Sequence, residues 1–260
     1  MVLPLFDDNS GRVAVPIVNY ALIIANVFVF LVPQQFGTNE EFTYAFSTVP
    51  YRIVTRDNTP ISIQDHDDPI TPQRFRVPAV PPTPGTVYLT LLTAMFLHGG
   101  WGHLLGNMWF LWIFGDNVED HLGRARYLVF YLLCGVLASL AHVAFTEMFR
   151  QNDLLPCLGA SGAISGVLGG YMVLLPTNRV TVLMLRLLVD VPAYIAIGMW
   201  FVFQLVSGLG ALGDGAKAGG VAYGAHIGGF IAGMALVLPF TAGREPPRRR
   251  RDRDLSLVNR

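Results

Sequence analysis

The sequence predicts an all-α, polytopic membrane protein in which six helices cross a bilayer. Of its 260 residues, 52% are hydrophobic and only 14% are charged, whereas soluble domains carry roughly 25% charged residues. The mean hydropathy is +0.46, and several apolar runs approach the roughly 20 residues that a helix needs to cross the hydrocarbon core. The net charge of zero gives no indication of a nucleic-acid partner.

Six apolar runs define the expected spans. We place them at residues 17–32, 104–114, 127–145, 159–175, 180–206 and 221–240. Asp7 and Asp8 stand where a signal peptide would carry basic residues, so we expect the first run to be retained as a span. The second run is short and polar at its start, which indicates a helix that begins below the membrane surface.

The distribution of arginines predicts that both termini are cytoplasmic, because cytoplasmic loops carry an excess of Lys and Arg. With six spans, the termini share a side with Arg12, Arg124, Arg126, Arg179, Arg244 and the arginine cluster at 248–251. We therefore expect a cytoplasmic N-terminus at 1–16, a six-helix membrane domain at 17–242 and a basic cytoplasmic tail at 243–260. The expected location is a bacterial plasma membrane, with the protein embedded in the lipid bilayer.

One long stretch separates the first two spans. This first loop, residues 34–102, is expected on the extracytoplasmic side, and its prolines prevent any long helix. Near its end, residues 88–98 are apolar again but too few to cross the bilayer. We expect them to form an element that lies in the membrane interface.

Two short motifs place reactive side chains at membrane depth. Ser161 lies in Gly-Ala-Ser-Gly at the start of the fourth run, and His226 lies in Ala-His-Ile-Gly-Gly within the sixth. Reactive groups inside a membrane are rare and usually functional, and a hydroxyl becomes a good nucleophile when an adjacent base takes its proton. Considered alone, a serine at that place is more often a simple helix N-cap.

Glycines at four-residue spacing predict close packing of the fourth and sixth helices. They are Gly162, Gly166, Gly229 and Gly233. Small residues let the backbones of membrane helices approach one another closely. These glycines can serve packing alone, yet that packing is what would bring Ser161 within hydrogen-bond reach of His226.

A third pair, His103 and Asn107, lies at the start of the second run. The two residues are four apart, so they share one face of a helix, and both side chains can donate hydrogen bonds. Donors of this kind can stabilise the negative charge of a tetrahedral intermediate. The alternative is a buried polar pair that bridges helices without a catalytic role.

Together these motifs resemble the rhomboid family of intramembrane serine proteases. The resemblance extends over residues of about 91–239 and includes the run Gly-Asp-Asn-Val-Glu-Asp at 115–120. It implies a serine endopeptidase that uses a Ser-His dyad and no cofactor or metal. It also implies that the clients are transmembrane segments of single-pass membrane proteins, cleaved near the extracytoplasmic face.

The resemblance further assigns roles to the residues of the motifs. Ser161 would be the nucleophile and His226 the general base and later acid, with Asn107, His103 and the Ser161 backbone N–H stabilising the oxyanion. Residues 208–220 would form a mobile cap over the site. Some members carry a tyrosine four residues after the nucleophile that stacks on the imidazole, and here Ser165 stands in its place. Tyr223 and the packing glycines are candidates for orienting His226.

Other classes of protein fit less well. A membrane metalloprotease needs a motif such as His-Glu-x-x-His, which the sequence lacks. A membrane aspartyl protease needs two intramembrane carboxylates, and Asp190 is the one good candidate. Glycine-broken helices also line transport sites, so a small-solute transporter remains an alternative. A catalytically inactive relative that only binds client helices is the nearest alternative.

Overall fold

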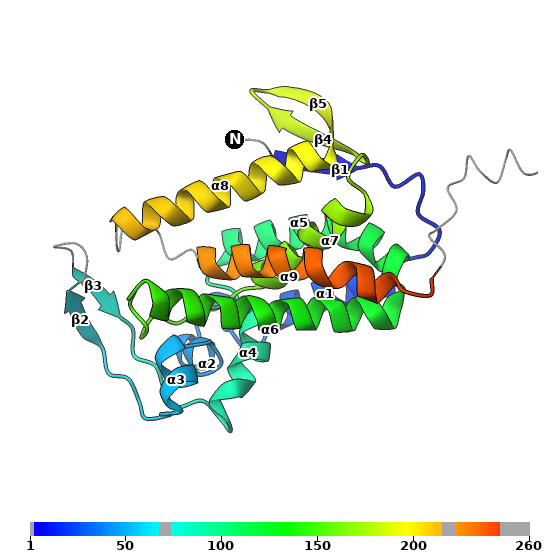
Figure 1. Ribbon diagram of the computed structural model, residues 1–260. Helices are drawn as coiled ribbons and strands as arrows, with labels where there is room; N and C mark the ends of the chain where they lie inside the picture. The colour runs from blue at the N-terminus through cyan, green and yellow to red at the C-terminus, as the bar shows by residue number, and fades with distance from the viewer. Residues whose placement is uncertain (1–2, 68–73, 215–221, 245–260) are drawn as a thin grey trace, which may run out of the picture.

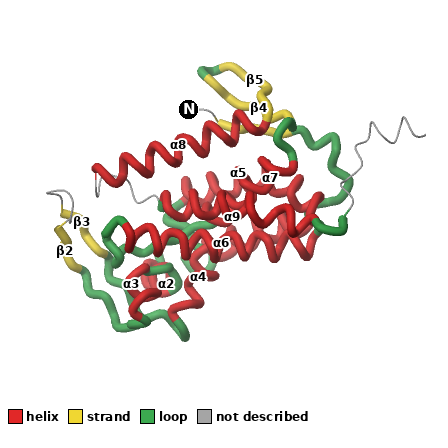
Figure 2. Tube along the Cα trace, in the orientation of Figure 1, coloured by secondary structure: helices red, strands yellow, loops and turns green. Residues whose placement is uncertain are grey.

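The computed structural model describes residues 3–67, 74–214 and 222–244 (Figure 1). Long helices lie side by side in a bundle, and short helices of the first loop pack beside it (Figures 1 and 2). A small sheet lies near one end of the bundle. Most of the expected basic tail, from residue 245 on, lies outside the described residues, as does the part of the expected cap at 215–220.

The long helices of the bundle are α1 (Ile17–Leu31), α5 (Trp101–Leu122), α6 (Arg124–Met148), α7 (Ser161–Leu174), α8 (Ala193–Asp214) and α9 (Tyr223–Thr241). Within the described residues, three helical segments are long and apolar enough to cross a membrane: α6, α9 and Ala193–Gly210 of α8. The helices α1 and α7 are apolar but shorter, and α5 carries acidic residues near its end. The count of six spans therefore stays a prediction.

The structure is mostly helical, as expected, but it also contains strands, and the fifth predicted span begins later than the sequence indicated. Residues 180–192 do not begin a helix but belong to a hairpin of β4 (Arg179–Met184) and β5 (Leu187–Pro192), and β1 (Leu3–Asp7) pairs with β4 in a sheet of order β1-β4-β5. All neighbouring strands are antiparallel. The run is apolar but rich in valine, which favours strands, and hydropathy alone cannot separate such a strand from a helix. The span begins only at Ala193.

The expected cap is also partly corrected. Residues 208–214 continue α8 as a helix, although their glycines indicated a loop. Glycine lowers helix stability by about 1 kcal/mol relative to alanine, but it does not prevent a helix that neighbouring turns already support. The glycine-rich composition of this segment therefore did not predict its conformation.

The first loop folds into short elements rather than a seventh span. It contains η1 (Gln35–Gly37), α2 (Glu40–Ala45), α3 (Pro50–Thr55), β2 (Gln64–Asp67), β3 (Arg74–Val77), η2 (Val87–Leu89), α4 (Thr90–Thr93) and η3 (Ala94–Phe96). The strands β2 and β3 pair in an antiparallel hairpin. Arg52 is buried and donates hydrogen bonds to the carbonyl oxygens of Thr59, Val80 and Pro81. The Arg52 guanidinium thus joins two separate stretches of the loop, at Thr59 and at Val80–Pro81.

Acidic side chains at the end of α5 hold the N-terminal segment in place. The Glu119 carboxylate accepts the backbone N–H groups of Val18 and Asn19 at 3.1 and 2.7 Å. These N–H groups lie in the first turn of α1, where a helix offers no acceptor of its own. Arg12 forms an ion pair with Asp116 at 2.6 Å. The start of α1 is therefore capped by a neighbouring helix.

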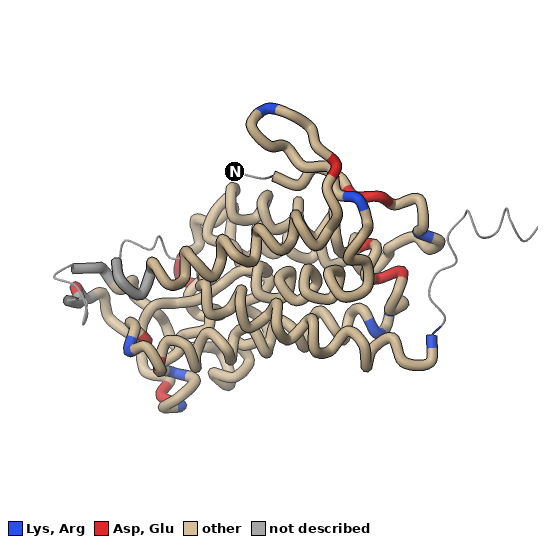
Figure 3. Tube along the Cα trace, turned by 45° about the horizontal axis from the view of Figure 1, so that its top comes forward, with Lys and Arg blue, Asp and Glu red and all other residues tan. Residues whose placement is uncertain are grey.

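Asp7 links the sheet to the same acidic end of the bundle. Its carboxylate accepts hydrogen bonds from the Tyr171 hydroxyl at 2.7 Å and from Asn117 Nδ2 at 2.6 Å. Burial raises the pKa of Asp7 to about 6, against the lowering effect of these two hydrogen bonds. Figure 3 shows that charged residues gather at the two ends of the bundle and leave a band between them nearly free of charge.

Candidate active site

Ser161 is the first residue of α7, a helix that is buried from Gly162 to Tyr171. Two residues earlier, Gly159 has a φ of +124°, which favours glycine, and its N–H donates to the Ala94 carbonyl at 2.8 Å. The first N–H groups of a helix lack acceptors within it and form the positive end of its dipole. The helix start therefore presents both a hydroxyl and backbone donors.

His226 lies in the first turn of α9, and its backbone N–H bonds the Ala222 carbonyl at 3.2 Å. The ring nitrogen Nε2 lies 2.7 Å from Ser161 Oγ. This hydrogen bond joins residues that are 65 positions apart in the chain. The structure thus brings together the two side chains that the sequence motifs singled out.

The packing glycines lie at the contact between α7 and α9. A methyl group at Gly229 would collide with the carbonyl oxygen of Gly162, and one at Gly233 would collide with that of Gly166. On the other side, a methyl group at Gly166 would lie 2.5 Å from Cβ of Cys134 on α6. The backbones of α7 and α9 are therefore as close as glycine permits, as expected where small residues line a membrane-helix contact.

Asn107 and His103 lie on neighbouring turns of α5 and line the same cavity as Ser161. Asn107 is 8% exposed, and its Nδ2 is buried without a hydrogen-bond partner. His103 Nδ1 accepts the Gly99 N–H at 3.3 Å, which leaves the proton of a neutral ring on Nε2. A methyl group at Gly159 would lie 2.7 Å from His103 Nε2. Glycine at this position keeps the space beside both donors open.

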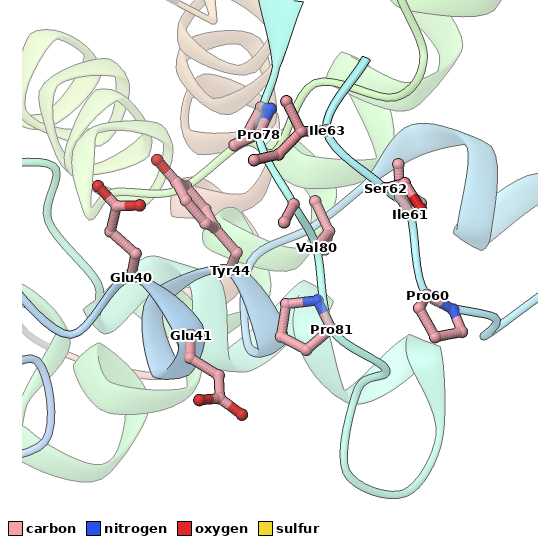
Figure 4. A pocket seen from close by; sticks show the side chains of 11 residues that line it. Glu40, Glu41, Tyr44, Pro60, Ile61, Ser62, Ile63, Pro78, Val80 and Pro81 are labelled. Carbon is pink, nitrogen blue, oxygen red and sulfur yellow. The ribbon is translucent and has the colours of Figure 1, made fainter.

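The cavity has a volume of about 680 Å³, and polar side chains from several helices line it. Its lining includes His103, Asn107, Ser161, Gln204 and His226. A second cavity of about 750 Å³ lies in the first loop, between α2 and residues 60–63 and 78–81 (Figure 4). That cavity has two glutamates in its wall but no histidine. The nucleophile and base lie in the first cavity, so we place the candidate chemistry there.

Gln204 of α8 is a site residue that the sequence analysis missed. Its Oε1 lies 2.9 Å from His226 Nδ1, and the side chain is 7% exposed. Neither candidate for orienting the histidine hydrogen-bonds its ring: the Tyr223 ring stands edge-on at 6.4 Å between centroids, and the glycines carry no side chain. Ser161 was identified as a polar side chain inside an apolar run. Gln204 has the same feature and could have been identified in the same way.

Ser165 occupies the place at which some rhomboids carry tyrosine. It is fully buried, and its hydroxyl donates to the Ser161 carbonyl oxygen at 2.7 Å. The side chain thus bonds its own helix one turn back. Within the described parts of the chain, no three His, Cys, Asp or Glu side chains gather in a way that could hold a metal ion.

Fold and site together define a multi-pass helical membrane protein that holds a hydrogen-bonded serine and histidine in an internal cavity. Residues 85–242 match the family model of the Rhomboid domain. Because this match covers more than half of the chain, the protein belongs to the rhomboid family. The resemblance drawn from the motifs is confirmed.

Three rhomboid proteins are similar to parts of this chain. The chain is 30% identical over 166 residues to Rhomboid protein 1, mitochondrial, of Saccharomyces cerevisiae, covering 64% of this chain and 46% of the relative. It is 35% identical over 150 residues to Rhomboid protease GluP of Bacillus subtilis, covering 57% and 26%. Presenilin-associated rhomboid-like protein, mitochondrial, of Homo sapiens is 30% identical over 95 residues, covering 36% and 24%. The chain spans less than half the length of each of these relatives.

Proposed function

We propose that this protein is an intramembrane serine endopeptidase in which Ser161 and His226 form the catalytic dyad. The observation that carries the proposal is the 2.7 Å hydrogen bond between Ser161 Oγ and His226 Nε2 inside a cavity. A nucleophile and a base within 2.6–3.2 Å of each other are the minimum needed for nucleophilic catalysis. The name of the GluP relative, a rhomboid protease, supports the same activity.

The reaction follows from these positions. Ser161 Oγ attacks the scissile carbonyl carbon while His226 Nε2 accepts the hydroxyl proton, which forms a C–O bond and an oxyanion. When the intermediate collapses, the C–N bond breaks and His226 returns its proton to the leaving amine. Water then attacks the acyl-enzyme, with His226 taking one proton from it. The ester C–O bond to Ser161 then breaks, the acid product leaves, and His226 returns the proton to Ser161 Oγ.

Asn107 and His103 are proposed to stabilise the oxyanion together with the Ser161 backbone N–H. The unpaired Nδ2 of Asn107 supports this role, because a buried donor without a partner costs about 1–3 kcal/mol, and an acceptor that forms during the reaction would remove that cost. A neutral His103 carries its proton on Nε2, as argued above, so it too offers a donor. An oxyanion in this cavity would supply the missing acceptor.

The proposed clients are transmembrane segments of single-pass membrane proteins. The dyad lies in the first turns of α7 and α9, so the expected topology, with both termini cytoplasmic, places it toward the extracytoplasmic side of a bacterial plasma membrane. In a helix, each carbonyl is bonded to an amide four residues on. A client must therefore unwind locally, and Gly or Pro lowers helix stability by about 1 or 3 kcal/mol.

The test is cleavage of a model single-pass substrate by the purified protein in liposomes. Wild type should cleave it near the outer end of its span, and Ser161→Ala should not. Ser139 also lines the cavity, so Ser139→Ala serves as a matched control and should remain active. Cleavage by the Ser161→Ala variant would reject the dyad.

The same assay tests how clients are selected. Replacing the helix-weakening Gly or Pro of the substrate with Leu should slow cleavage, because the scissile bond is then held in a stable helix. Equal turnover of both substrates would mean that local unwinding does not select the client. Cleavage confined to soluble unfolded chains would contradict the membrane mechanism.

A further inference from the structure

The His226 imidazole is held from both sides, by two side chains from two different helices. Ser161 of α7 lies 2.7 Å from Nε2, and Gln204 of α8 lies 2.9 Å from Nδ1. Gln204, His226 and Ser161 therefore form a hydrogen-bonded line across α8, α9 and α7. Gln204 is 7% exposed and lines the cavity beside His226.

Other neighbours of the ring do not orient it in this way. Trp200, one turn before Gln204, lies 6.3 Å from the imidazole between ring centroids and at 35° to its plane. Tyr223 stands edge-on at 6.4 Å. The Ser165 hydroxyl is engaged with the Ser161 carbonyl. Among the described residues, Gln204 and Ser161 are the two whose side chains hydrogen-bond the His226 ring.

We propose that Gln204 is the positioning residue of the dyad, a role that rests on the proposed protease function. Its Oε1 can only accept a hydrogen bond, so the facing Nδ1 of His226 must carry the ring proton. The neutral imidazole then has its lone pair on Nε2, directed at the Ser161 hydroxyl. Gln204 thereby selects the one neutral tautomer in which His226 can act as a base toward Ser161.

A neutral amide suits this position for a physical reason. A third group that orients the base recurs in nucleophilic sites, and in soluble serine hydrolases it is commonly a carboxylate. A carboxylate buried among membrane helices carries a large desolvation penalty. The amide supplies the same acceptor geometry without adding a charge. Because Gln204 belongs to α8, the position of this helix determines whether the hydrogen bond to His226 forms.

A matched pair of variants separates positioning from packing. Gln204→Met keeps the approximate length and volume of the side chain but removes the acceptor. Gln204→Glu keeps an oxygen acceptor in either protonation state. We expect Gln204→Met to lower kcat about 10- to 100-fold, which corresponds to a barrier raised by about 1.4–2.7 kcal/mol. KM should change little, because the lost hydrogen bond orients the base and does not contact the substrate. Gln204→Glu should restore kcat to within about tenfold of wild type.

The second readout is the rate at which a fluorophosphonate probe labels Ser161, which needs no protein substrate. It should fall in Gln204→Met and recover in Gln204→Glu in parallel with kcat. Phe203 is next to Gln204 but 64% exposed, so Phe203→Leu controls for a change in α8 and should label as wild type. The thermal unfolding midpoint of each variant shows whether a lower labelling rate is due to a less stable protein.

The outcomes distinguish this inference from the function on which it rests. If wild type cleaves and labels but Gln204→Met does so equally well, the positioning role is wrong and the dyad stands. If Met and Glu variants lose activity equally while remaining folded, the side chain serves packing and the inference is also wrong. If wild type neither cleaves nor labels at Ser161, the proposed function itself fails.

Discussion

Replacing Gly229 with alanine probes how strictly the contact between α7 and α9 sets the dyad. The new methyl group would overlap the carbonyl oxygen of Gly162 and lie 3.2 Å from Cβ of Ala138 on α6. The oxygen belongs to the backbone and cannot rotate away, so the helices must separate by roughly 1 Å to reach ordinary contact distance. That separation would lengthen the 2.7 Å bond between Ser161 and His226 beyond normal hydrogen-bond range.

The expected cost follows from two opposing effects. Overpacking a core costs about 1–3 kcal/mol, whereas alanine stabilises a helix by about 1 kcal/mol relative to glycine. Unfolding free energy should therefore fall by no more than about 2 kcal/mol, while kcat falls about 100-fold because a 1 Å misplacement is costly in catalysis. Gly198 has nothing within 4 Å of the added methyl position, so Gly198→Ala should be active and slightly more stable.

The assay is substrate cleavage by both variants in liposomes, with thermal unfolding measured in the same preparations. A Gly229→Ala protein with wild-type kcat would show that the dyad tolerates the displaced helix, contrary to this prediction. Equal losses in Gly229→Ala and Gly198→Ala would mean that alanine disturbs the bundle generally rather than through this contact.

Three further predictions test other parts of the structure. Asn107→Ala should lower kcat about 10²–10³-fold in the cleavage assay with a smaller change in KM; unfolding of the bundle instead would make Asn107 a structural residue. Glu119→Ala should lower the free energy of unfolding by about 1 kcal/mol, because two N–H groups at the start of α1 lose their cap, and an unchanged unfolding curve would contradict that capping role. Burial raises the pKa of the Asp7 carboxyl from 3.8 to about 6. The protonated carboxyl therefore contributes most to folding stability below pH 3.8, and this contribution is lost as the pH rises through about 6. The unfolding midpoint of Asp7→Asn should therefore fall less than that of wild type between about pH 4 and pH 7.5, and an identical fall in both proteins would exclude Asp7 as the source.

Much of the candidate site could be predicted because its signals are local. Ser161 and His226 stand out as reactive groups in apolar runs, and the glycine spacing indicates which helices pack together. The distance between them could not be predicted, since it depends on how α7 and α9 meet across 65 residues of chain. Gln204 was missed because no sequence spacing relates it to His226, although an amide in an apolar helix is itself a signal.

The missed sheet has a definite physical origin. Hydropathy measures transfer from water and carries no information on backbone conformation. Residues 180–192 are apolar enough to extend a helical span, yet their valines favour a strand, and β1 provides the partner that completes a sheet. That partner lies more than 170 positions away in the chain, so pairing with it could not be inferred from the local pattern.

Covalent labelling of the serine measures whether His226 activates Ser161. Purified wild-type protein in liposomes is treated with a fluorophosphonate probe, and the modified residue is located by mass spectrometry, with His226→Ala and Ser139→Ala treated in parallel. If His226 activates Ser161, the probe modifies Ser161 in wild type and in Ser139→Ala, and labelling is lost in His226→Ala. Undiminished labelling of Ser161 without His226, or no labelling of Ser161 in an intact wild-type protein, would contradict this activation.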